Sequence, residues 1–293
     1  MKIKYLLVAG FFTALIFSCT ETGGEKNQID SDIIDPKKAL NTNFDGKIFS
    51  IPSPIQTALL IKSASSTYYE DILNPISNLD KYTTEYSKAL NLGIYGADLG
   101  YTSLYDQKGA SINYLSAVEK LTSSLGLEGA FDKTFMDKYE RNLANQDSMM
   151  IVVSDAFRKA DLFLKNAKRK PTSSLILTGG WIESMHFACQ LSGKSKNKQI
   201  VNRIGEQKLT LESICEILKE YNKKGANDQL LAQMQDLLVS FEEIKINYNY
   251  VEPTTNVASK TTTLKHSISF DISEKTLVDI TKKITEIRNS IIS

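Results

Sequence analysis

Small side chains recur along one face of the segment 85–107, and this pattern limits the fold more than any other feature of the chain. They lie at positions i, i+4, i+7 and i+11 and are Ala89, Gly93, Gly96 and Gly100. An α-helix places this spacing in one narrow stripe. A glycine inside a helix costs about 1 kcal/mol relative to alanine. Three glycines on one face therefore predict a central helix that another element approaches closely, rather than a dinucleotide-binding loop, whose glycine spacing differs.

Apolar residues at helical spacing continue through most of the chain after Ile55. We predict helices over residues 56–65, 68–73, 85–107, 110–125, 131–146, 147–169, 173–191, 198–205, 211–221, 228–247 and 273–292. The predicted fold class is therefore all-α, a multi-helix bundle or an irregular helical array, in a single domain over residues 44–293. At most a short β excursion is expected near 263–272.

The last two predicted helices each carry a single apolar stripe with alternating spacings of three and four. The stripe residues are Leu230, Met234, Leu237, Phe241 and Ile244 in the first, and Leu277, Ile280, Ile284, Ile287 and Ile291 in the second. Such a stripe is stable only against another apolar face. We predict that these helices pack on each other, antiparallel, with Phe241 and Ile280 near the contact.

The first eighteen residues have the organisation of a secretory signal peptide. Two lysines precede an apolar run, Leu6–Phe17, and a small residue, Ser18, follows it. The run has about a dozen residues, whereas a helix needs roughly 20 to cross a bilayer. Residues 1–18 are therefore predicted to be a signal peptide and not a membrane span.

The end of this segment, Ile16-Phe17-Ser18-Cys19, resembles the lipobox of bacterial lipoproteins. The resemblance implies that Cys19 receives a diacylglyceryl group, that the signal is cut before it, and that a fatty acid such as palmitate acylates the new amine. It also implies a lipid-anchored protein of the cell envelope, at the outer membrane, on either the periplasmic or the surface face. The polar segment 19–43 is then a lipidated flexible tether. An ordinary signal peptide that contains a cysteine is the alternative.

A second resemblance lies in the central segment. The stretches Asn91–Leu99 and Ile51-Pro52-Ser53-Pro54 resemble those of helical envelope lipoproteins of no known activity. This resemblance implies a helical fold and an envelope location, and it supplies no catalytic residues.

The charge balance of the chain bears on its partners, and its cysteine content bears on disulfide formation. The 35 basic and 34 acidic residues nearly cancel, which does not favour a nucleic-acid partner. Besides Cys19, the chain has Cys189 and Cys215. They could pair in a compartment outside the cytoplasm, or remain two free buried thiols.

Glu183, His186 and Cys189 follow one another at intervals of three on a single predicted helix. A di-iron bundle would need a second Glu-x-x-His, and the other histidine, His266, has no acid three residues before it. A zinc site would lack a fourth ligand. We therefore interpret these residues as a core histidine beside a buried thiol and keep them only as weak candidates for metal binding.

Eight tyrosines lie between Tyr68 and Tyr114. Tyrosines can stack on sugars or anchor a partner, and they can also pack helices together with hydroxyls at the rim. The candidate ligand-binding residues are Tyr95, Asp98, Tyr101 and Tyr105. Asp98 stands among small residues, so it is expected to be buried and to need a partner.

No sequence motif for a nucleophile elbow, phosphate loop, calcium loop or haem attachment is present, so no catalytic residue and no cofactor are predicted. The leading hypothesis is a membrane-anchored envelope lipoprotein that binds a partner or acts as a scaffold without catalysis. The first alternative is a periplasmic or surface ligand-binding protein with a tyrosine-lined cleft. The second is a metal-dependent enzyme that uses Glu183 and His186. The expected partners are the membrane through Cys19 and an envelope protein or small molecule.

Overall fold

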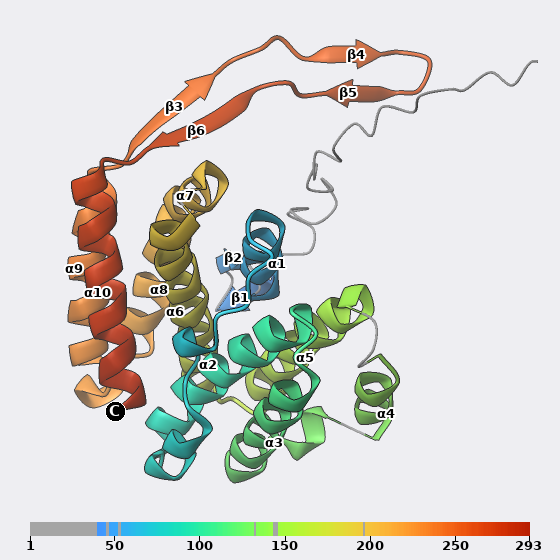
Figure 1. Cartoon of the computed structure of the whole chain (residues 1–293), viewed down its shortest axis with the longest axis vertical. Coiled ribbons are helices and arrows are strands. Elements are labelled where there is room, and N and C mark those ends of the chain that lie inside the picture. The colour runs from blue at the N-terminus through green and yellow to red at the C-terminus, as the bar shows by residue number, and fades with distance from the viewer. Residues whose placement is uncertain (1–39, 45–46, 52–53, 132, 143–145, 196) are drawn as a thin grey trace, which may run out of the picture.

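A computed structural model describes residues 40–44, 47–51, 54–131, 133–142, 146–195 and 197–293 (Figure 1). The predicted signal peptide, Cys19 and the tether as far as residue 39 lie outside these ranges. No helix among the described residues is long and apolar enough to cross a membrane.

Helices make up most of the described chain and confirm the predicted all-α class. The α-helices are α1 (Pro54–Ala64), α2 (Glu85–Leu104), α3 (Lys108–Ser124), α4 (Lys133–Asn142), α5 (Gln146–Asn166), α6 (Lys170–Ser195), α7 (Lys198–Glu206), α8 (Lys208–Glu220), α9 (Asp228–Glu242) and α10 (Glu274–Ile292). Short 3-10 turns are η3 (Glu70–Ile72), η4 (Ile76–Lys81), η5 (Glu128–Ala130) and η6 (Lys223–Gly225). Buried apolar side chains from Phe44 to Ile291 form one core.

Strands are short and pair only as antiparallel ribbons in the described chain. They are β1 (Leu40–Phe44) with β2 (Lys47–Ile51), β3 (Lys245–Asn249) with β6 (Ser267–Asp271), and β4 (Thr254–Asn256) with β5 (Thr261–Thr263). Strand β1 begins inside the segment predicted as a tether, because its backbone pairs in register with β2. That segment was therefore predicted to extend four residues too far.

Several predicted helices begin or end at other residues in the structure, and one of them is only a single turn. The helix predicted over 228–247 ends at Glu242, since the residues after Ile244 alternate apolar and polar and form β3. The helix predicted over 68–73 is only the single turn η3. Helix α6 begins at Lys170, so Pro171 lies in its first turn, where its missing N–H costs no helical hydrogen bond.

Helices α2 and α6 cross at the centre of the fold, as the stripe of small residues predicts. Helix α2 begins after Thr84, whose side chain accepts from the Ser87 backbone N–H in a capping box. A Cβ atom added at Gly93 would collide with the Ile176 carbonyl and lie 2.6 Å from the Gly180 nitrogen. A Cβ atom at Gly179 would likewise collide with the carbonyl of residue 90 in α2. Glycines on both helices thus bring the two backbones into contact.

Helices α9 and α10 pack antiparallel, which confirms the prediction from their apolar stripes. Lys283 bonds to Asp236 at 2.9 Å and Ser240 donates to Asp279 at 2.6 Å, so rising numbers on one helix meet falling numbers on the other. The side chain of Ile280 is fully buried, and so is that of Phe241.

Between α9 and α10 the chain leaves the helical body as one long hairpin, residues 245–271, which we call the arm (Figure 1). Ribbon β3–β6 forms its base and ribbon β4–β5 its outer part. The expected β excursion near 263–272 is therefore only the returning half of a longer hairpin.

Candidate functional site

A cluster of buried charged side chains joins three helices that are far apart in the sequence. Asp98 of α2, Glu183 of α6 and Arg288 of α10 are each at most 5% exposed. The guanidinium of Arg288 donates from Nε to Glu183 Oε2 at 2.6 Å and from Nη2 to Glu183 Oε1 at 2.8 Å. Nη2 also donates to the carbonyl of Ile72 at 3.1 Å. This two-pronged geometry is the strongest arrangement for an arginine and a carboxylate.

Asp98 lies beside this ion pair and is expected to hold a proton. Its Oδ2 accepts from the Asn74 backbone N–H at 3.4 Å, and Oδ1 has no hydrogen-bond partner among the described residues when the carboxyl is ionised. Burial, and then the charge of Glu183, raise the pKa of Asp98 well above its usual range, against the opposing effect of Arg288. A protonated carboxyl is the form that burial beside the Arg288–Glu183 pair favours for Asp98.

This protonation predicts a pH-dependent effect of Asp98→Asn. An acid whose pKa is raised by folding stabilises the fold most at low pH, and this contribution is lost as the pH rises through the folded pKa. Asparagine does not titrate. We therefore expect the melting temperature of Asp98→Asn, relative to wild type, to increase steadily from about pH 4, the usual aspartate pKa, towards pH 8.

Thermal melts of both proteins across this range test the prediction. The exposed Asp80→Asn is the control, because the Asp80 side chain is 85% exposed and should show no such trend. A difference between Asp98→Asn and wild type that stays constant with pH would mean that Asp98 is ionised in the folded protein.

The weak metal candidates are engaged in packing. Glu183 is held by Arg288, and His186 is buried, which lowers its pKa to about 4 and keeps the ring neutral at physiological pH. Burial raises the pKa of the Cys189 thiol to about 12, so it is not a thiolate. No three metal-binding side chains are grouped in the described part of the chain. Cys189 and Cys215 are both free and buried, so they do not form a disulfide.

The tyrosines predicted as ligand-binding residues are buried and bonded to one irregular segment, residues 65–82. Tyr95 donates to the Pro75 carbonyl at 3.0 Å, and Tyr105 donates to the Ser65 carbonyl at 2.8 Å. The Tyr101 hydroxyl accepts from the Tyr69 backbone N–H at 3.1 Å. An irregular segment leaves backbone groups without helical partners. These hydroxyls therefore supply partners that hold the segment against α2.

Asn91 and Tyr82 bond to the C-terminal end of α10, and the sequence did not identify either of them as a partner of this helix. Asn91 donates to the Ile291 carbonyl at 3.1 Å, and Tyr82 donates to the Ile292 carbonyl at 3.3 Å. Both carbonyls belong to the last turn of α10, where no further helical N–H follows. In the sequence, the position of Arg288 between Ile284 and Ile291 on the apolar face is the one indication that it lies in the interior.

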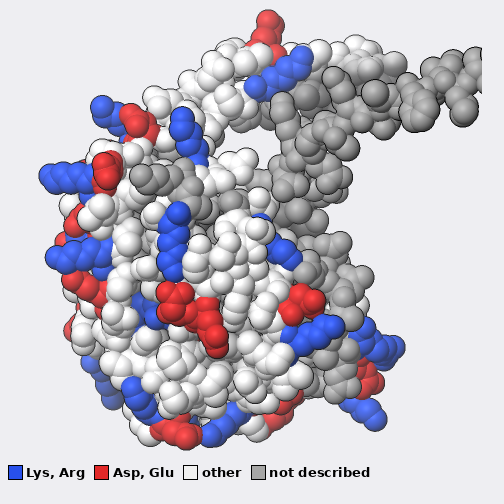
Figure 2. Space-filling view, in the orientation of Figure 1, with Lys and Arg blue, Asp and Glu red and all other residues white. Residues whose placement is uncertain are grey.

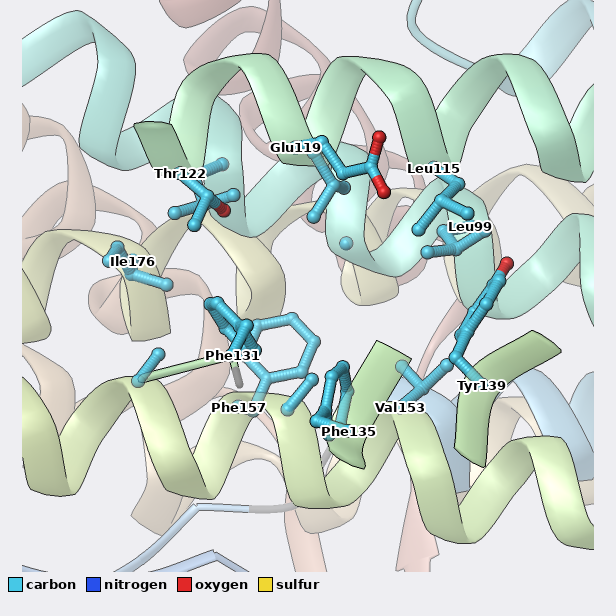
Figure 3. A pocket seen from close by; sticks show the side chains of 15 residues that line it. Leu99, Leu115, Glu119, Thr122, Phe131, Phe135, Tyr139, Val153, Phe157 and Ile176 are labelled. Carbon is cyan, nitrogen blue, oxygen red and sulfur yellow. The ribbon is translucent and has the colours of Figure 1, made fainter. Parts of the chain in front are cut away.

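Two of the cavities in the described structure lie away from the tyrosine cluster. The first, of about 90 Å³, lies between α2, α3, α4, α5 and α6 and is open on one side (Figure 3). The second is an open cleft of about 730 Å³ between the end of α6, α7 and the start of α10. Neither is lined by Tyr95, Asp98, Tyr101 or Tyr105. The tyrosine cluster and these two spaces are thus separate features.

More than half of the large apolar side chains that are exposed in the described structure lie on the arm. Its exposed apolar side chains are Ile246, Tyr248, Tyr250, Val251, Val257, Leu264 and Ile268. In the register of β3 and β6, Ile246 pairs with Phe270 and Tyr248 pairs with Ile268. Paired residues, and residues two apart on a strand, share one face of a ribbon. The base of the arm therefore has one apolar face and one polar face.

Fold and site together define a helical protein with a buried polar centre and a projecting β arm. Comparison with known proteins assigns no family, because no family model, no curated protein and no solved structure matches the chain.

Proposed function

We propose that this protein is a non-catalytic binding lipoprotein of the bacterial envelope, anchored through Cys19, and that its arm captures a partner protein. The observation that carries the proposal is the exposed apolar face of the arm. Exposed apolar patches rimmed by polar residues mark interaction sites more often than chance. Tyr248 and Ile268 are more than half exposed, at 58% and 53%.

The arm is oriented by a fixed contact at its base. Phe270 of β6 packs on Gly205 of α7, where an added Cβ atom would lie 2.6 Å from the Phe270 Cβ and Cγ. Because Phe270 shares a face with Tyr248 and Ile268, the apolar face of the arm is turned towards the helical body. Figure 2 shows an open space between the arm and the helical body. A partner segment could enter this space and contact both surfaces.

The arm is also suited to pairing through its backbone. Neither β3 nor β6 has a second neighbouring strand in the described structure, so each presents unpaired N–H and C=O groups along its outer edge. The 27 residues 245–271 contain only three lysines and two acidic residues, and charged side chains are sparse on the arm in Figure 2. The favoured partner is therefore an extended, largely uncharged segment that adds a strand to the arm.

The alternative of a tyrosine-lined ligand cleft has less support. Its candidate hydroxyls are bonded to backbone groups of residues 65–82 and lie inside the core. The metal-dependent alternative has less support still, because Glu183 is bound by Arg288.

A crosslinking experiment in cells that make the protein tests the proposal. A photo-reactive amino acid replaces Tyr248 on the apolar face or, as matched control, Asn247 on the polar face of the same strand. We expect position 248 to give one discrete adduct and position 247 to give far less. The adduct at 248 should fall when Cys19→Ser removes the acylated residue and releases the protein from membranes.

Two results would contradict the proposal, one for each of its parts. Equal adducts at 247 and 248, or none at either, would remove the arm as a binding surface. A Cys19→Ser protein that remains acylated and membrane-bound at the wild-type level would remove the lipid anchor.

A further inference from the structure

We infer that the cavity between α3, α4 and α5 is a binding site for the hydrocarbon part of a small ligand with an uncharged polar end. This site is separate from the arm, and nothing in the proposed function requires it. The cavity is open to solvent on one side, and none of its lining residues belongs to the segment 65–82.

The wall of the cavity consists of carbon. Phe131, Phe135 and Phe157 form one side, and Leu115 of α3 lies on the other (Figure 3). Val118 of α3 also lines the cavity. Among the described lining residues, no nitrogen or oxygen atom contributes exposed surface to the cavity. A wall of this kind cannot hydrogen-bond water, so it favours an apolar occupant.

A glycine on α2 leaves part of this cavity open. Gly96 lines the cavity, and a Cβ atom added there would lie 2.8 Å from the tip of the Phe157 ring. The glycine lets Phe157 lie against α2 and leaves the volume beside the ring open. Gly96 therefore differs from Gly93, which faces the backbone of α6.

The volume sets the size of the ligand. An apolar protein cavity of about 150 Å³ takes up benzene, and this cavity of about 90 Å³ is open at one side. It suits a short alkyl chain or a single ring whose other end remains at the mouth. Glu119 is the only charged side chain among the described residues that line the cavity, and its carboxylate contributes no exposed surface to the wall. A charged head group would therefore lose hydration at the cavity without gaining a partner, so the polar end should be neutral.

Titration with 1-hexanol, followed by calorimetry and ligand-observed NMR, tests the inference on the whole protein. A ligand of this size is expected to bind with a Kd of about 1 mM. Leu115→Trp fills the cavity from α3 and should weaken binding at least about tenfold, the equivalent of about 1.4 kcal/mol. Ile112→Trp is the matched control, since Ile112 lies on the same helix, is 54% exposed and does not line the cavity.

Ala156→Leu, which adds carbon to the opposite wall, provides a second cavity-filling variant should Leu115→Trp fail to fold. Hexanoate and hexylammonium test the neutral end, and both should bind at least about tenfold more weakly than hexanol. No binding of hexanol by the wild type, or equal binding by wild type and the cavity-filling variants, would overturn the site. Binding of either charged ligand as tightly as hexanol would overturn the neutral end.

Discussion

Gly93→Ala is expected to lower the free energy of unfolding by about 3 kcal/mol or more, at the upper end of overpacking effects. The added methyl group would meet backbone atoms, the Ile176 carbonyl and the Gly180 nitrogen. Backbone atoms cannot rotate away as a side chain can, so α2 and α6 would have to separate. For a chain of this size the loss corresponds to a fall in melting temperature of about 6 to 12 °C. Denaturant unfolding and thermal melts measure both.

Two other glycines give graded controls for this effect. Gly109 lies near the start of α3 with no atom within 4 Å of an added Cβ, so Gly109→Ala should stabilise the protein by up to about 1 kcal/mol. Gly96→Ala should have an intermediate effect, because the atom that it meets is the end of the Phe157 ring. If Gly93→Ala is tolerated as well as Gly109→Ala, the close approach of α2 and α6 is wrong.

The helices could be predicted because their signals are local. Spacings of three and four in the chain gave α9 and α10, and the same stripes indicated that these helices pack together. The small residues of α2 likewise indicated a close contact. They did not identify the helix that makes this contact. Its glycines, Gly179 and Gly180, lie more than eighty residues away, and two adjacent glycines in an apolar helix do not form a stripe that the sequence would reveal.

The arm and the ion pair were harder to predict for physical reasons. The alternation of apolar and polar residues over 245–250 is short and directly follows the apolar stripe of α9. The sequence pattern therefore predicts a helix that continues to residue 247. Most of the arm is polar and is not packed on the core, which removes the alternation of burial that usually reveals a strand. Arg288 pairs with a residue 105 positions away, and no local pattern encodes such a pair.

The tyrosines show that a grouping of one residue type in the sequence does not determine its function. Their grouping was visible in the sequence, and so was their place on α2. Their role depends on the irregular segment 65–82, whose backbone groups need partners. A hydroxyl that reaches a loop carbonyl and one that reaches a ligand have the same sequence pattern.

Arg288→Met is expected to destabilise the protein by about 3 to 5 kcal/mol, the usual cost of removing one partner of a buried ion pair. The substitution leaves the carboxylate of Glu183 buried without its guanidinium and leaves the Ile72 carbonyl without its donor. Denaturant unfolding measures the loss. The exposed pair of Arg158 and Asp155 is the control, and Arg158→Met should cost no more than about 1 kcal/mol.

The double variant Glu183→Gln with Arg288→Met separates the cost of a stranded charge from the loss of packing. If the stranded charge dominates, removing it should recover much of the stability lost in Arg288→Met, because a neutral amide costs less to bury than a carboxylate. If the double variant is no more stable than Arg288→Met, the arginine acts mainly through its contacts with Ile72 and its neighbours. In either case Arg288 joins α10 both to Glu183 of α6 and to the Ile72 carbonyl before α2, so its loss should loosen α10 first. Hydrogen exchange should then show faster opening of α10 than of α2, and equal acceleration in both would mean that the cluster stabilises the core as a whole.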